Sequence, residues 1–190
     1  MAMKEMIEVR FHSRAGQGAK TASEMFADAL MGKGFYVQSF PEYGAARQGA
    51  PMAVFLRVYD KPIKTHSNIY NPHIVVVLDD TLLADIDVCD GIKKEGKVII
   101  STKRKKEDVL KMISTKEGKI FTVDASGIAV QEFGVPITNT PILGALVKVS
   151  GFMTLDEIKK ILIKKFTAKF GEEIMKKNMR ALERGFNEVK

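Results

Sequence analysis

The chain has 190 residues, a formal net charge of +7, 45% hydrophobic residues and a single cysteine. This length suits one domain with a sizeable core, and we expect 1–190 to form it. No apolar run approaches the roughly 20 residues that cross a bilayer, and the first residues lack a signal-peptide core, so we expect a cytoplasmic protein without membrane contact. Cys89 alone excludes an internal disulfide, a cysteine-ligated iron–sulfur cluster or a structural zinc, and the scattered histidines indicate no metal site.

The first stretch with a clear pattern is a strand, a glycine-bearing turn and a helix. Apolar and polar residues alternate over 7–11, which predicts a strand with one buried face. Apolar residues then recur at helical spacing over 19–31, which predicts an amphipathic helix packed on that strand. The turn between them carries Gly16 and Gly18. It leaves backbone amides without helical acceptors where the helix begins.

Two phosphate-binding motifs nearly match this turn, and both fail. A dinucleotide fingerprint needs a third small residue where Thr21 stands. A Walker A loop needs glycines where Arg14 and Ala19 stand, ahead of Lys20. The bare amides and the helix dipole still favour an anion at this point. A tight turn without a ligand is the alternative, and the turn by itself does not choose between the two.

The rest of the chain alternates between predicted strands and helices. Strands are expected at 35–40, 52–59, 63–65, 74–78, 97–101 and 119–123. Helices are expected at 81–85, 106–113 and 142–149, in a short stretch that ends at 133, and twice within 154–190. The continuous apolar run at 74–78 indicates a central parallel strand. The pattern predicts an α/β fold, with a doubly wound, mainly parallel sheet, helices on both faces and a C-terminal helical pair.

A long connection, rich in small residues, joins the strands predicted at 35–40 and 52–59. Connections of this length tend to be functional. In doubly wound sheets, ligands and partners meet the carboxyl ends of the strands, where this connection and the glycine turn both fall. We therefore expect the two loops to face one site, with Arg47 as the charged residue of most interest.

Positive charge is concentrated in 93–106, where many Lys and Arg residues stand against Glu95 alone. Such a cluster can meet nucleic acid, an acidic partner or an anionic substrate. We expect no nucleic-acid binding, because no aromatic residues are interleaved and no recognition motif accompanies the cluster. A solvated surface is the simplest interpretation, and steering of an acidic partner protein by 103–106 is the alternative.

The two loops together resemble those of a known family. The matching residues are Phe11-His12-Ser13-Arg14-Ala15-Gly16-Gln17-Gly18, then Phe40-Pro41-Glu42-Tyr43-Gly44, then Arg47-Gln48-Gly49-Ala50-Pro51. They resemble the gamma subunit, or gamma domain, of the 2-oxoacid:ferredoxin oxidoreductases, and pyruvate:ferredoxin oxidoreductase in particular. The likeness covers essentially the whole chain. The Arg-x-Gly-Ala-Pro form at 47–51 resembles pyruvate or branched-chain 2-oxoacid members more than 2-oxoglutarate members.

This resemblance implies a non-redox subunit without catalytic residues of its own. It implies alpha, beta and delta partner subunits that hold thiamine diphosphate, Mg and [4Fe-4S] clusters, with no cofactor bound by this chain alone. Such a complex converts a 2-oxoacid and coenzyme A to acyl-CoA and carbon dioxide and reduces ferredoxin. The loops are then expected to shape the coenzyme A cavity or a subunit interface. The residues concerned are Arg14, Gly16, Gln17, Gly18, Lys20, Glu42, Tyr43, Gly44, Arg47, Gln48 and Gly49.

Other interpretations stay open at this point. Arg47 suits either a coenzyme A phosphate or a carboxylate of a partner chain. A free-standing Rossmann-type nucleotide-binding module would place Glu42 on a ribose hydroxyl, although Thr21 counts against it. A purely structural subunit would use both loops for packing alone.

Overall fold

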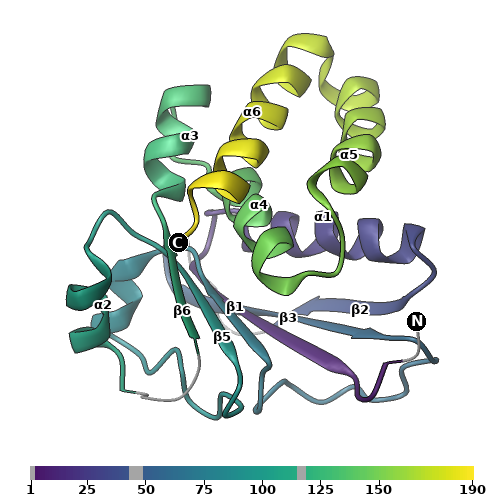
Figure 1. The fold of residues 1–190 in the computed structure, drawn as a ribbon. Helices are drawn as coiled ribbons and strands as arrows, with labels where there is room; N and C mark the ends of the chain where they lie inside the picture. The colour runs from purple at the N-terminus through teal and green to yellow at the C-terminus, as the bar shows by residue number, and fades with distance from the viewer. Residues whose placement is uncertain (1–2, 43–48, 115–118) are drawn as a thin grey trace.

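A six-stranded sheet with the strand order β2-β3-β1-β4-β5-β6 forms the centre of the fold (Figure 1). The computed structural model describes residues 3–42, 49–114 and 119–190, without the side chains of 164–166 and 168–170. The strands are β1 (Ile7–Arg14), β2 (Tyr36–Pro41), β3 (Pro51–Tyr59), β4 (Ile74–Val77), β5 (Lys97–Ser101) and β6 (Lys119–Val123). β1, β4, β5 and β6 pair in parallel, whereas β3 runs antiparallel to both β1 and β2. The predicted mainly parallel α/β sheet is confirmed.

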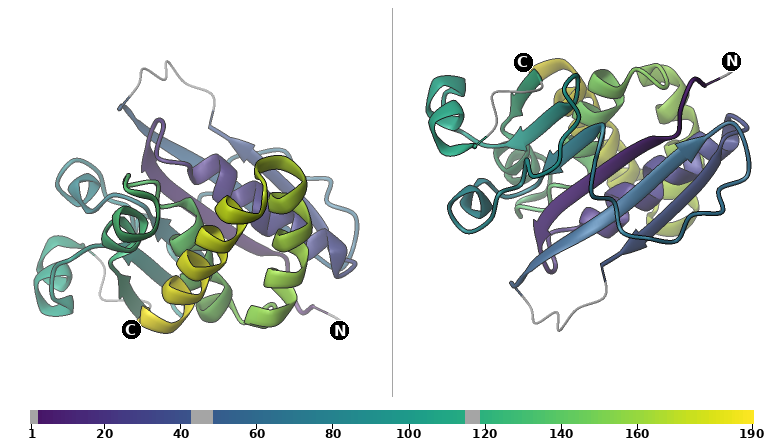
Figure 2. Two further views of the ribbon diagram at one scale, coloured as in Figure 1. Left: turned by 90° about the horizontal axis from the view of Figure 1, so that it is seen from above. Right: turned by 90° about the horizontal axis from the view of Figure 1, so that it is seen from below.

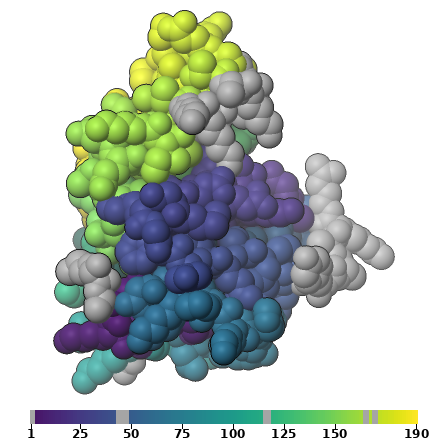
Figure 3. Space-filling model, turned by 90° about the vertical axis from the view of Figure 1, so that its right-hand side faces the viewer, coloured from purple at the N-terminus to yellow at the C-terminus, as the bar shows by residue number. Residues whose placement is uncertain are grey.

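Most of the helical structure covers one face of this sheet (Figure 1). The helices on it are α1 (Ala19–Gly32), α3 (Ala125–Phe133), α4 (Asn139–Ser150), α5 (Leu155–Phe170) and α6 (Glu172–Glu188). They enclose the larger apolar core, in which Phe11, Phe26 and Leu146 are fully buried. On the side that carries β2, the C-terminal helices rise above α1 in the space-filling view (Figure 3). The expected C-terminal helical pair is present, and Thr154 and Glu157 form the capping box that begins it.

The second face carries the short helix α2 (Lys106–Met112) and the 3-10 helix η1 (Asp80–Ala84) beside β4 and β5. Segment 60–73 crosses the half of this face formed by β1, β3 and β2, as the view from below shows (Figure 2). Helices therefore lie on both faces, as predicted, but unequally. The strand predicted at 63–65 is wrong, because this segment runs across the face of the sheet and pairs with none of the six described strands.

Segment 60–73 also changes the environment of β1. The alternating pattern predicted one buried face, yet Arg10 and His12 on the opposite face are only 7% and 8% exposed. Arg10 donates from Nε to His12 Nε2 (3.0 Å) and from Nη2 to the carbonyls of Val88 (3.1 Å) and Asp90 (2.6 Å). Burial, and next the charge of Arg10, lower the pKa of His12 to about 4. His12 is therefore neutral at physiological pH and accepts the Arg10 hydrogen bond.

None of the helices in the described ranges has the length and apolar character needed to span a bilayer. Strand bounds at 97–101 and 119–123 are as predicted, whereas the helix expected at 142–149 extends further at both ends. Its added first turn, from Asn139, is the part that reaches the glycine turn.

Candidate functional site

The glycine turn and the segment that leads into β3 lie side by side at the carboxyl end of β1. The Ala15 amide donates to the Ala50 carbonyl (2.9 Å), and the Gly49 amide donates to the Ala15 carbonyl (3.2 Å). β1 and β3 remain paired as far as Arg14 and Pro51. Residues 14–18 and 49–51 thus form one continuous surface. The prediction that the two loops share one edge of the sheet is confirmed for the described residues.

Gly16 and Gly18 shape the turn in different ways. Both adopt left-handed backbone conformations, with φ of 99° and 90°, where a side chain would introduce strain. A Cβ at position 16 would meet nothing within 4 Å among the described residues, whereas one at position 18 would lie 3.1 Å from the Cβ of Asn139. Gly18 therefore also allows the first residues of α1 and α4 to approach each other. In the part of the chain that the structure describes, no side chain caps α1 at Gly18.

Arg14 is paired within the chain and anchors the turn to η1. Its Nη2 donates to Asp85 Oδ2 (2.9 Å) and to Thr81 Oγ1 (2.9 Å). Its Nε lies 3.5 Å from Asp79 Oδ2. Binding of an external phosphate by this guanidinium would have to compete with these partners. The geometry thus favours a positioning role for Arg14.

Gln17 and Asp79 complete the same network. Gln17 accepts the Arg14 amide at Oε1 (2.8 Å) and donates from Nε2 to Asp79 Oδ2 (2.6 Å). Asp79 Oδ1 accepts the Thr81 amide (3.0 Å) and so caps η1. Burial acts to raise the pKa of Asp79, but hydrogen bonds from Thr81 and Gln17 outweigh it and lower that pKa. A carboxylate of the chain itself is therefore held beside the turn, for which the sequence left a bound anion and a turn without a ligand as alternatives.

The other predicted site residues lie in three situations. The Lys20 side chain is 62% exposed, and its Nζ is 3.8 Å from Glu24 Oε1, so its charge faces solvent. Glu42 Oε1 accepts a hydrogen bond from Asn68 (3.3 Å), which ties it to segment 60–73. Gly49 has a φ of 81°. The predicted site residues outside the described ranges are Tyr43, Gly44, Arg47 and Gln48.

Sequence reasoning did not connect Asp79, Thr81 and Asp85 with this turn. A usable signal existed, because Asp79 follows the apolar run at 74–78, and such a run predicts a central strand. The carboxyl ends of neighbouring parallel strands meet at one edge. The missing information was that β4 is the neighbour of β1.

A polar hollow of about 510 Å³ extends from the turn across the carboxyl ends of β4, β5 and β6. Its lining includes Gln17, Asp79, Thr102, Ser126 and Thr138. This volume falls within the range of small-molecule sites. The Thr138 hydroxyl is buried and has no hydrogen-bond partner in the described structure.

The described residues do not fit an iron–sulfur cluster or another metal. Cys89 is 3% exposed, and burial raises the pKa of its thiol to about 11, so it is not a thiolate at neutral pH. Within 3–42, 49–114 and 119–190, no three His, Cys, Asp or Glu residues are grouped to hold a metal ion.

Comparison with known protein families matches residues 8–188 to the family described as "Pyruvate ferredoxin/flavodoxin oxidoreductase". The chain belongs to this family. A relative from Thermococcus kodakarensis, the pyruvate/ketoisovalerate oxidoreductases common subunit gamma, is 46% identical over 184 residues, or 97% of each chain. Pyruvate synthase subunit PorC of Thermotoga maritima is 48% identical over 187 residues, or 98% of this chain and 96% of that one.

Two solved structures share this fold. Pyruvate oxidoreductase subunit PORC of Thermotoga maritima superposes with a TM-score of 0.86 at 45% identity, covering 98% of both chains. The 2-oxoglutarate:ferredoxin oxidoreductase of Magnetococcus marinus gives 0.74 at 17% identity, covering 96% of this chain and 31% of that chain. The second likeness shows the fold alone. The resemblance to gamma subunits, predicted from the two loops, is confirmed.

Proposed function

We propose that this chain is the gamma subunit of a pyruvate:ferredoxin oxidoreductase complex. The observation that carries the proposal is the family match over 8–188, together with near full-length identity to gamma and PorC subunits. The complex would convert pyruvate and coenzyme A to acetyl-CoA and carbon dioxide and pass the electrons to ferredoxin. Alpha, beta and delta subunits would supply thiamine diphosphate, Mg and [4Fe-4S] clusters.

A non-redox role for the chain itself is supported by its donor groups. An iron–sulfur cluster takes several thiolate ligands, and Cys89 is the single cysteine of the sequence. That cysteine lies among apolar side chains of the second face, with Val88 and Ile92. The isolated chain is therefore expected to be inactive.

For the two loops we propose a share in the coenzyme A cavity at a subunit interface. Support comes from uncapped amides where α1 begins, the exposed charge of Lys20 and the adjoining polar hollow. Helix starts and lysines suit phosphate groups. Arg14 and Gln17 would act by holding the turn in shape, since both side chains are bound to neighbours in the chain.

A branched-chain 2-oxoacid complex is the second candidate. A specific observation favours it: the Thermococcus kodakarensis relative is named as a subunit common to pyruvate and ketoisovalerate oxidoreductases. One gamma subunit would then serve two complexes that differ in their other chains.

Anaerobic purification of the tagged chain from its native host tests the subunit assignment. We expect thiamine diphosphate, iron and acid-labile sulfide to co-elute with coenzyme A-dependent ferredoxin reduction, assayed with pyruvate and with 2-oxoisovalerate. The substrate that supports the activity decides between the two candidates. Elution of the chain alone, with binding of NAD(P) or another nucleotide, would instead favour the free-standing Rossmann-type module.

Lys20→Ala tests the coenzyme A contact within the same complex. Loss of an exposed cation that meets a phosphate is expected to raise the KM for coenzyme A roughly tenfold, with little change in kcat. Lys176→Ala is the matched control, because Lys176 is equally exposed on α6 and pairs with Glu172. An unchanged KM for coenzyme A in both variants would indicate that the loop serves subunit packing alone.

A further inference from the structure

The basic cluster predicted at 93–106 divides into two parts in the fold. β5 separates them, with Lys97 at its start and 103–106 beyond its carboxyl end. In the first part, Lys93 pairs with Glu5 (2.6 Å) and Lys97 donates to the Val149 carbonyl (2.6 Å). The second part lies at the edge of the sheet that carries the candidate site.

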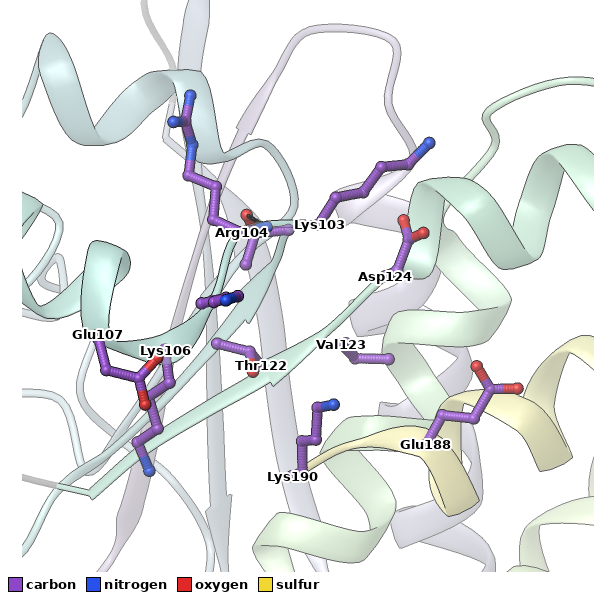
Figure 4. A pocket seen from close by; sticks show the side chains of 11 residues that line it. Lys103, Arg104, Lys106, Glu107, Thr122, Val123, Asp124, Glu188 and Lys190 are labelled. Carbon is purple, nitrogen blue, oxygen red and sulfur yellow. Dashed lines mark hydrogen bonds between the residues drawn. The ribbon is translucent and has the colours of Figure 1, made fainter.

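The second part borders a groove of about 910 Å³ between the start of α2, the end of β6 and the end of α6 (Figure 4). Lys190 joins this wall because its backbone pairs with Thr122 in both directions (2.8 and 3.1 Å). We call the cationic residues of this groove the basic ridge. They are Lys103, Arg104, Lys105, Lys106 and Lys190.

Most of the positive charge on the basic ridge is not neutralised. Arg104 pairs with Asp80 (3.2 Å), whereas the four lysines form no ion pair in the part of the chain that the structure describes. Among the described residues, three acidic side chains line the groove against five cationic ones, and one of the three, Glu107, lies in the first turn of α2. The other two have partners of their own. Asp124 accepts the Gly127 amide (2.7 Å) and caps α3, and Glu188 accepts from Arg184 Nε (2.7 Å). The groove therefore presents a positive field to solvent.

The backbone below these side chains is well anchored. The Thr102 amide donates to the Val123 carbonyl (2.9 Å), and the Thr102 hydroxyl donates to Asp80 Oδ2 (2.5 Å). The same hydroxyl accepts the Arg104 amide (3.0 Å). The backbone that carries these charges is thus held in place by hydrogen bonds, while the lysine side chains extend from it without ion pairs among the described residues.

The arrangement fits a broad partner better than a small anion. Lys103, Arg104 and Lys106 point in different directions from the loop, so they form no cage around one point (Figure 4). Permanent interfaces have apolar centres in which lysine is depleted. Val123, the apolar side chain of the groove wall, is only 3% exposed. Lysine-rich, apolar-poor surfaces suit encounters that are steered by charge.

We propose that the basic ridge is the docking surface for the acidic face of a second protein that binds transiently. This inference goes beyond the proposed function, because it assigns a partner surface on the gamma chain itself. Association would be fast at low salt and would slow as salt screens the lysines.

The test uses the purified complex with two electron acceptors. One is an acidic ferredoxin, and the other is methyl viologen, a small cation that the ridge cannot steer. For the triple variant K105E/K106E/K190E, which spares Lys103 because that residue also lines the polar hollow, we expect kcat/KM for ferredoxin to fall at least ~10-fold at low salt and to lose its salt dependence. Methyl viologen reduction should stay unchanged. The control K4E/K61E/K64E makes the same change in net charge at exposed lysines near segment 60–73 and should match the parent.

Three results would overturn the proposal. An equal loss in the control variant would assign the effect to net charge rather than to the ridge. Failure of the ridge variant to assemble, seen by gel filtration, would make the ridge a permanent subunit contact. Unchanged ferredoxin kinetics, with calorimetry showing lost binding of inorganic triphosphate, would make it a small-anion site. Failure of the proposed function is distinct, because the protein purified with the parent chain would then reduce neither acceptor.

Discussion

Replacing Gly185 by alanine is expected to lower the free energy of unfolding by about 3 kcal/mol, because α6 crosses α4 at backbone contact. A Cβ at position 185 would lie 1.9 Å from the Pro141 carbonyl oxygen and 2.6 Å from its carbon. Backbone atoms cannot move aside as a flexible side chain can, so the two helices must separate. Alanine favours the helix by roughly 1 kcal/mol over glycine, which is too little to offset this overlap.

Helix α4 also requires a glycine where it crosses α6. A Cβ at Gly144 would lie 2.1 Å from the Leu182 carbonyl oxygen. One glycine from each helix therefore permits the crossing. Because α4 begins at Asn139, which lies beside Gly18, separation of α4 and α6 would also displace the helix start next to the glycine turn.

Gly32→Ala is the matched control for this variant. Gly32 is the last residue of α1, and a Cβ there would meet its nearest neighbour, Ile161 Cδ1, at an ordinary 3.9 Å. Urea unfolding of the purified chain, followed by circular dichroism, should show a lower midpoint for Gly185→Ala and no loss for Gly32→Ala. Equal midpoints for Gly185→Ala and the parent would show that the crossing tolerates a methyl group.

Replacing Arg57 by alanine is expected to cost roughly 3–5 kcal/mol, the usual range when one partner of a buried ion pair is removed. Arg57 lies on β3 and is 1% exposed. Its Nε donates to Glu8 Oε1 (2.9 Å), Nη1 to Gln38 Oε1 (3.1 Å), and Nη2 to the Ser67 carbonyl (2.7 Å). Alanine would leave these acceptors beneath segment 60–73 without a donor.

A double variant separates the lost charge from the lost packing. Arg57→Met with Glu8→Gln removes both charges and keeps most of the volume, so it should recover much of the stability that Arg57→Ala loses. Both proteins can be compared with the parent by urea unfolding. A change within 0.5 kcal/mol for Arg57→Ala, roughly the value for an exposed site, would show that Arg57 does not hold segment 60–73 on the sheet.

The burial of polar residues was the feature that the sequence predicted least well. In β1 the alternation placed Arg10 and His12 on a face expected to meet solvent. Both are buried, because segment 60–73 and the turn around Val88 fold over that face. Alternation reports that neighbouring side chains point to opposite sides, but what covers each side depends on residues far away in the chain.

Only part of the candidate site was predictable, because some of its contacts join residues that are far apart in the chain. Gly16 and Gly18 were found because a tight turn imposes a local backbone conformation that favours glycine. The partners of Arg14 were not found, since Asp79 and Asp85 are more than sixty residues away. The basic cluster was seen as one unit, although β5 carries its two parts to opposite ends of the sheet.

Local patterns therefore established the α/β class and the glycine turn, and two short loop motifs indicated the family resemblance. Each depends on residues close together in the chain, where backbone preference and side-chain periodicity act directly. The reversed direction of β3, the neighbours of β1 and the internal pairing of Arg14 were decided only when the strands packed. Strand order and burial follow from the covering of a shared apolar core by distant segments, so no short window of sequence contains them.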